Sequence, residues 1–216
     1  MRAHSALLGT SVGAKALVAV SGLAFAAWCA LHVLGNVAAF AGPAALDGYA
    51  AWLRGAYGVP LWCLRATLAA VVGAHMVLGL VLWRRARRAR GERHRVRSVA
   101  SHLPSRLVRW CGLALAIFLV FHVLHINYGL ALPGFVRGHV YDNLKSAFAS
   151  PLVVGVYLLA SALVGLHLAH GAAAALSSLG VLPPSTGTHR AALLAGSLWC
   201  LGFAATPLAM ALGVLR

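Results

Sequence analysis

Five long apolar stretches constrain the fold of this chain more than any other feature of its sequence. A helix needs about 20 apolar residues to cross a bilayer, and each stretch is at least that long. Only 10% of the 216 residues are charged, against about 25% in a soluble domain. We therefore predict an all-α integral membrane protein with a single membrane domain over residues 1–216. The five predicted transmembrane helices span residues 11–41, 59–83, 106–131, 151–178 and 189–215.

Glycine and proline residues support several of these boundaries. Pro151 suits the start of a helix, where its missing N–H removes no hydrogen bond. Gly180, followed by two prolines, is typical of a helix end. The apolar stretch over residues 16–41 is too long for a signal peptide, whose apolar region has about 7–15 residues. We interpret it as a retained first helix.

Positive charge is spread unevenly along the chain and predicts the orientation of the helices. With the N-terminus inside, 13 of the 18 lysine and arginine residues lie on the inner side and five on the outer side. Lysine and arginine favour the cytoplasmic side of a membrane. We therefore predict the N-terminus inside and the C-terminus outside. The arginine-rich loop from Arg84 to Arg97 is either a stop-transfer anchor or, in addition, a docking surface for a partner. Because orientation explains the net charge of +15, the charge does not indicate nucleic-acid binding.

Four of the five predicted helices carry histidine inside their apolar stretches. Histidine in hydrocarbon is energetically costly, and imidazole is a common ligand of haem iron. One such histidine alone is equally well explained by a hydrogen bond to a neighbouring helix, but four of them favour two haems. A bundle enclosing non-covalent haem b is expected, because the sequence contains no CxxCH motif. The histidines are His32, His75, His122 with His125, and His167 with His170.

The depth of each histidine in the membrane predicts how they pair. An α-helix rises about 1.5 Å per residue, so His75 and His167 lie about 14 Å and 16 Å from the inner ends of their helices. By the same rule His32 and His122 lie roughly 30 Å and 24 Å from the inner side. We predict an inner haem held by His75 and His167, and an outer haem held by His32 and His122. The outer match in depth is the poorer one.

Two questions about the neighbours of these histidines stay open in the sequence. His125 and His170 lie three residues after their partners, so either is an alternative ligand, or a group that binds a haem propionate or a quinone. Small residues near the histidines suit the edge of a porphyrin, although glycine also packs transmembrane helices against one another. These glycines are Gly35, Gly73, Gly79, Gly165 and Gly171.

In this order, the motifs resemble the dihaem cytochrome b (b558-type) membrane anchor subunit of succinate dehydrogenases and fumarate reductases. The resemblance covers nearly the whole chain. It rests on His32-x-x-Gly35-Asn36, Gly42-Pro43-x-Ala45-x-x-x-Tyr49, His75, Phe121-His122-Val123, Leu166-His167-x-x-His170-Gly171 and Ser178-Leu179-Gly180.

The resemblance implies a function and a set of partners. By position, the axial ligands of the family fall on His32, His75, His122 and His167, with the same inner and outer pairing. The subunit would anchor a flavoprotein subunit and an iron–sulfur subunit at the bacterial cytoplasmic membrane. Electrons of the tricarboxylic acid cycle would pass from succinate through both haems to a membrane quinone, taken to be menaquinone, or in reverse to fumarate. Some members carry membrane glutamates that move protons. Here Gly165 stands two residues before His167, so the resemblance does not extend to that proton path.

A quinone needs hydrogen-bonding groups near the last haem, at the edge of the apolar layer. We expect it at the outer ends of the first three helices, where such groups gather: Asn36, Asp47, Tyr49, Asn127 and Tyr128. A rival cluster at the inner end consists of Lys15, Ser21 and Arg106. Two other functions compete with this prediction. One is a free-standing dihaem cytochrome b, and the other is a transporter or structural protein without haem, for which we find no internal repeats.

Overall fold

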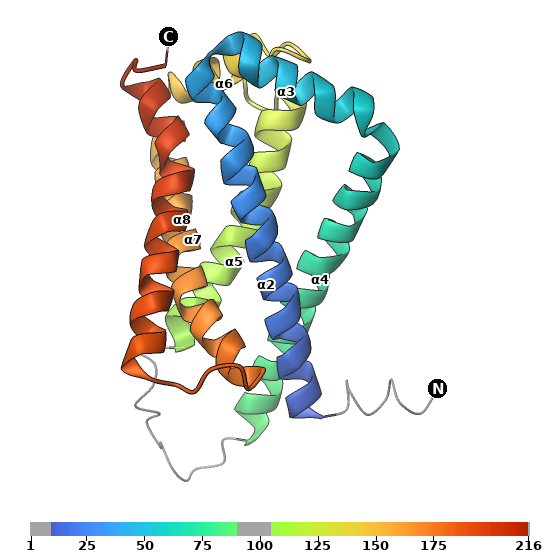
Figure 1. The fold of residues 1–216 in the computed structure, drawn as a ribbon, viewed down its shortest axis with the longest axis vertical. Coiled ribbons are helices and arrows are strands. Elements are labelled where there is room, and N and C mark those ends of the chain that lie inside the picture. The colour runs from blue at the N-terminus through green and yellow to red at the C-terminus, as the bar shows by residue number, and fades with distance from the viewer. Residues whose placement is uncertain (1–9, 90–104, 216) are drawn as a thin grey trace.

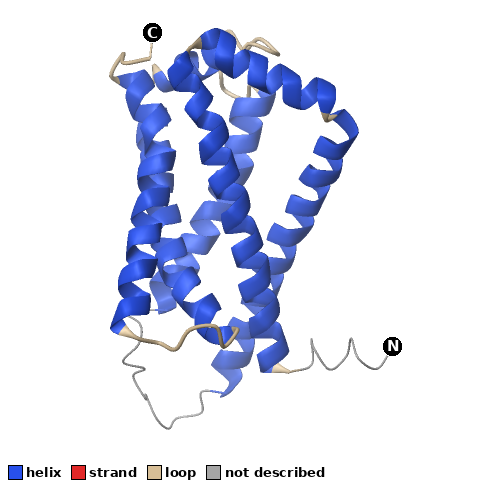
Figure 2. Ribbon diagram, viewed as in Figure 1, coloured by secondary structure: helices blue, strands red, loops and turns tan. Residues whose placement is uncertain are grey.

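The computed structural model describes residues 10–89 and 105–215, which are helical over most of their length (Figures 1 and 2). Five helical stretches are long and apolar enough to cross a membrane. They are α2 (Ser11–Asn36) with the 3-10 helix η1 (Val37–Ala41), α4 (Gly58–Ala89), α5 (Ser105–His122) with the π-helix η2 (Val123–Asn127), α7 (Pro151–Ser178) and α8 (Thr186–Ala211). The predicted fold of five long apolar helices is confirmed, and this is a multi-pass membrane architecture.

Local capping explains where several of these helices begin and end. The hydroxyl of Thr10 accepts a hydrogen bond from the N–H of Gly13, which fixes the start of α2. The predicted bounds 11–41 and 151–178 are confirmed. Gly180 has a φ of 71°, and the N–H groups of Gly180 and Val181 donate to the carbonyls of Ser177 and Leu176. This is the Schellman arrangement that ends α7, as the glycine predicts.

Three predicted helix bounds are wrong. The second helix runs on to Ala89, because the arginines after Trp83 continue the helix instead of ending it. The fifth covers Thr186–Ala211 rather than 189–215, because the side chain of Ser185 caps its start. The third ends at Asn127 instead of residue 131, and its last five residues form a π-helix.

Two shorter helices cross one end of the bundle (Figure 1). They are α3 (Pro43–Ala56) and α6 (Val140–Phe148), and both lie in segments that we predicted as loops. Pro43 occupies the first turn of α3, and the side chain of Leu46, on the inner face of that helix, is buried. The Oδ1 of Asp47 accepts a hydrogen bond of 2.9 Å from the N–H of Tyr141, in the first turn of α6. This contact ties the two short helices together, and such a cap contributes about 1 kcal/mol.

The bundle has two distinct ends, which we name by their contents. At the α3–α6 end, a packed cluster includes Leu46, Tyr141, Phe148 and Tyr157. At the opposite end, which we name the Arg84 end, α2 begins and α4 ends (Figure 1). There Arg109 of α5 lies over the ring of Trp83 of α4, 6.0 Å from its centre.

Helices α7 and α8 pack backbone against backbone at Gly165 and Gly196. A Cβ on Gly165 would lie 2.7 Å from the carbonyl oxygen of Gly196, and a Cβ on Gly196 would overlap the carbonyl oxygen of Gly165. Small residues allow membrane helices to approach this closely. The contact leaves no room for a side chain at position 165, so a glutamate there is sterically excluded. In contrast, α4 buries none of the residues of its apolar span against the rest of the chain.

Candidate functional site

One pair of histidines meets between α4 and α7. The ring centres of His75 and His167 lie 6.3 Å apart, with 74° between the ring planes. The sequence predicts this pairing from helix depth, and the structure brings the two side chains together. The two imidazoles come from separate helices, His75 from α4 and His167 from α7. Both residues stand nearer the last residue of their helix than the first, and α4 and α7 both end at the Arg84 end, so the pair lies toward that end.

Hydrogen bonds from α2 hold the ring of His75. Its Nδ1 lies 3.1 Å from the carbonyl oxygen of Val18 and 3.2 Å from the hydroxyl oxygen of Ser21. A carbonyl only accepts hydrogen bonds, so Nδ1 carries the proton and Nε2 keeps a free lone pair. Metal-binding histidines are commonly oriented in this way, with the second nitrogen donating to a backbone carbonyl. In this tautomer Nε2 of His75 would be free to bind a metal.

Each ring of this pair also lies against a glycine from another helix, His75 against α2 and His167 against α5. A Cβ on Gly22 of α2 would be 3.0 Å from Cε1 of His75. A Cβ on Gly112 of α5 would be 3.4 Å from Cε1 of His167. The Nδ1 of His167 is buried near the carbonyl of Val108 and reaches no hydrogen-bond partner among the described residues.

The two contacts repeat one short pattern. Val18 and Gly22 are four residues apart in α2, and Val108 and Gly112 are four residues apart in α5. In each helix the glycine lacks a side chain, so the histidine ring can approach the valine carbonyl one turn earlier. The residues before the glycines are Ser21 and Cys111. The sequence analysis did not predict this contact between a glycine and a histidine ring of another helix. The signal that would have found it is Val-x-x-(Ser/Cys)-Gly, present once in each helix.

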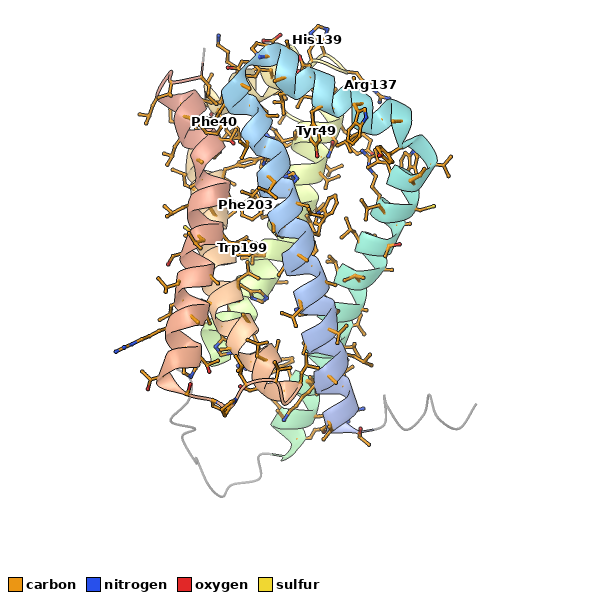
Figure 3. The ribbon with its side chains drawn as sticks, in the orientation of Figure 1. Phe40, Tyr49, Arg137, His139, Trp199 and Phe203 are labelled. Carbon is orange, nitrogen blue, oxygen red and sulfur yellow. The ribbon has the colours of Figure 1, made fainter. Side chains whose placement is uncertain are left out.

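A second pair meets between α2 and α5, closer to the α3–α6 end. The ring centres of His32 and His122 lie 5.9 Å apart, with 85° between the ring planes. The ring centre of Phe203 of α8, which Figure 3 labels, lies 6.0 Å from that of His32. Phe118 stacks on His122 at 5.8 Å. The mismatch in expected depth has a simple cause. In Figure 1, α5 begins farther into the bundle than α2, so fewer residues bring His122 to the level of His32.

His125 has a different environment from His122. It is buried, with 1% of its surface exposed, and its ring stacks on Phe121 at 4.9 Å. The hydroxyl of Tyr157 lies 3.1 Å from Nδ1 of His125 and 3.3 Å from Nδ1 of His122. Of the two candidates, His122 is therefore the one that faces His32, while His125 faces Tyr157. In the same way, His167 faces His75, and His170 lies near His189 at the start of α8.

The spacing within both pairs suits two imidazoles that bind one metal ion from opposite sides. An imidazole nitrogen binds a metal at about 2.0 Å, so the ring centres of two such ligands are roughly 6 Å apart. The described residues include no cluster of three or more histidine, cysteine or acidic side chains that could hold a bare ion. Two histidines are sufficient for an iron whose other four ligands come from a porphyrin. The residues of both pairs fit a haem.

The glycines named from sequence have mixed roles. Gly35 lies against Tyr49, whose hydroxyl would be 3.0 Å from an added Cβ, and Gly165 packs on α8. For these two glycines the structure favours the second of the two alternatives, the packing of helices against one another. Added Cβ atoms at Gly73, Gly79 and Gly171 would meet nothing within 4 Å.

The predicted quinone residues gather at the α3–α6 end, where they have different surroundings. Asp47 caps α6, as described above, and Tyr49 packs on α2. The side chain of Asn36 makes no capping hydrogen bond to η1. Asn127 and Tyr128 are exposed at the end of η2. In the rival cluster, Lys15 is exposed and Ser21 contacts His75, while the side chain of Arg106 lies outside the described residues.

Comparison of the chain with known protein families, curated proteins and solved structures finds no match.

Proposed function

We propose that this protein is the dihaem cytochrome b membrane subunit of a succinate:quinone oxidoreductase. The proposal rests on one observation, that two histidine pairs lie at two levels of one helical bundle. His75 with His167, and His32 with His122, each join two different helices at a spacing that suits one haem. When bound, each haem supplies an iron that carries one electron. The bundle would give the electron a path of two steps across the membrane.

The protein residues have defined tasks in this proposal. The four histidines would hold the two haems in place, and the carbonyl of Val18 would keep His75 in the tautomer that binds through Nε2. The aromatic rings of Phe118 and Phe203 would exclude water from the outer pair. Burial and ligand hydrogen bonds are the means by which a protein tunes haem potentials.

The charge distribution supports an arrangement with the partner subunits at the Arg84 end. Arg84, Arg85, Arg87 and Arg88 all belong to the last turns of α4, at the level where α2 begins. Positive charge favours the cytoplasmic side, so this end would face a flavoprotein and an iron–sulfur subunit there. His75 and His167 would then receive electrons first, and the quinone would react at the α3–α6 end, beyond His32 and His122.

The proposal is tested by isolating the protein from its native membrane through an affinity tag. We expect flavin and iron–sulfur clusters to copurify with two haems per chain, and succinate to reduce both haems. A preparation with haems but without flavin or iron–sulfur clusters would instead support the free-standing dihaem cytochrome b. A preparation without haem would favour a transporter or structural protein.

A further inference from the structure

Tyr157 is a buried tyrosine whose hydroxyl lies between two histidines of another helix. Its ring packs against Phe118 and Phe148, each at 5.1 Å. Its hydroxyl is within hydrogen-bond distance of Nδ1 of both His122 and His125. A phenol has one proton, so the hydroxyl can donate to only one of the two histidines.

The direction follows from the proposed function, on which this inference rests. A histidine that binds haem iron through Nε2 carries its proton on Nδ1. His122 therefore donates to the oxygen of Tyr157. The hydroxyl proton of Tyr157 is then free to go to Nδ1 of His125, which acts as the acceptor. The two hydrogen bonds then point in one direction, from His122 to Tyr157 and from Tyr157 to His125.

We propose that Tyr157 is the positioning residue of the outer haem ligand. Its oxygen fixes the ring plane and the tautomer of His122, and His125 keeps the hydroxyl turned so that its oxygen can accept. His125 is too deeply buried to exchange this partner for water, since 1% of it is exposed. The π-helix over Val123–Asn127 begins directly after His122, and such turns are frequent at functional sites.

The arrangement has two measurable consequences. A hydrogen bond from Nδ1–H makes the imidazole a stronger electron donor to ferric iron, which lowers the reduction potential. With a haem bound, the 85° between the rings of His32 and His122 would direct the two ligands to different iron d orbitals, which would then stay nearly equal in energy. The ferric haem should then give a highly anisotropic low-spin signal in electron paramagnetic resonance.

The test is Tyr157→Phe in the full-length, haem-loaded protein, with redox titration and low-temperature resonance spectra. Without the hydroxyl, we expect the outer haem to shift to higher potential and its largest g value to fall, while the inner haem is unchanged. Ser161→Ala is the matched control. Ser161 is a buried hydroxyl one turn farther along α7 that donates only to the carbonyl oxygen of Tyr157, at 2.8 Å. It should leave both haems unchanged.

The inner haem serves as an internal check that the bundle is folded. Loss of the outer haem alone in Tyr157→Phe also supports the inference. Unchanged outer signals, or equal changes in both haems, overturn it. If that variant cannot be isolated, His125→Leu removes the acceptor and leaves the hydroxyl in place, and it must shift the outer potential in the same direction. Absence of haem in the unmodified protein would overturn the proposed function as well, which separates the two failures.

Discussion

The backbone of Gly22 lies directly against the imidazole ring of His75, so closely that an added Cβ would be 3.0 Å from Cε1 of the ring. The contact lets the ring reach the carbonyl oxygen of Val18, 3.1 Å away, one helical turn before the glycine. The glycine therefore controls the orientation of a histidine on another helix. This relationship connects a small residue in α2 to the ring that meets His167.

Replacement of Gly22 by alanine should weaken haem binding at the inner pair. The new Cβ pushes the His75 ring away from Val18, and overpacking of this kind costs about 1–3 kcal/mol. Haem content and haem loss from the inner site measure the effect. Gly73→Ala is the matched control, because a Cβ there meets nothing within 4 Å. Equal haem retention in both variants would contradict the role of the Gly22 contact.

His75→Ala or His167→Ala should remove the inner haem and leave the outer one. Each substitution deletes one of two axial ligands, while His32 and His122 keep their spacing of 5.9 Å. Optical difference spectra with haem quantification give the result. His170→Ala should retain both haems, because the ring that meets His75 is that of His167. Loss of the inner haem in His170→Ala, with retention in His167→Ala, would reverse the ligand assignment in α7.

The charge asymmetry predicts that the Arg84 end faces the cytoplasm. A membrane-impermeant thiol reagent added from outside should label a cysteine at Asp142, on α6, but not one at Thr186, at the start of α8. Both positions are exposed, and the background is Cys63→Ala because Cys63 is also exposed. Labelling at Thr186 alone would invert the topology and move the partner subunits to the α3–α6 end.

The quinone site is predicted at the α3–α6 end. Tyr128→Phe should raise the KM for quinone about 2- to 13-fold, since one hydrogen bond contributes about 0.5–1.5 kcal/mol. Tyr57→Phe is the control, as another exposed tyrosine at the same end. Asp47 is less suited to this test, because its replacement also removes the cap of α6. An unchanged KM in Tyr128→Phe and Asn36→Ala, with an increase in Lys15→Ala, would place the site at the Arg84 end.

Some features of this fold could be predicted from the sequence, because they depend on local properties. Apolar length alone located the five long helices, and helix rise alone paired His75 with His167. Helix α3 escaped prediction because its glycine and proline start and its short apolar pattern look like a loop. The π-helix after His122 and the contact of Tyr157 with His125 depend on neighbouring helices, and no local pattern predicts them. The glycine at position 22 belongs to a local pattern, but the histidine that it meets is set by the packing of α4 on α2.

The most direct test of the account is the number of haems bound per chain. The full-length protein, purified in detergent with haem supplied during expression, should carry two extractable b haems for each polypeptide. Quantitative haem extraction and a reduced-minus-oxidised spectrum give this number. Two haems, lost one at a time in His75→Ala and His32→Ala, are the result that the two histidine pairs predict. One haem per chain, or none, would contradict it.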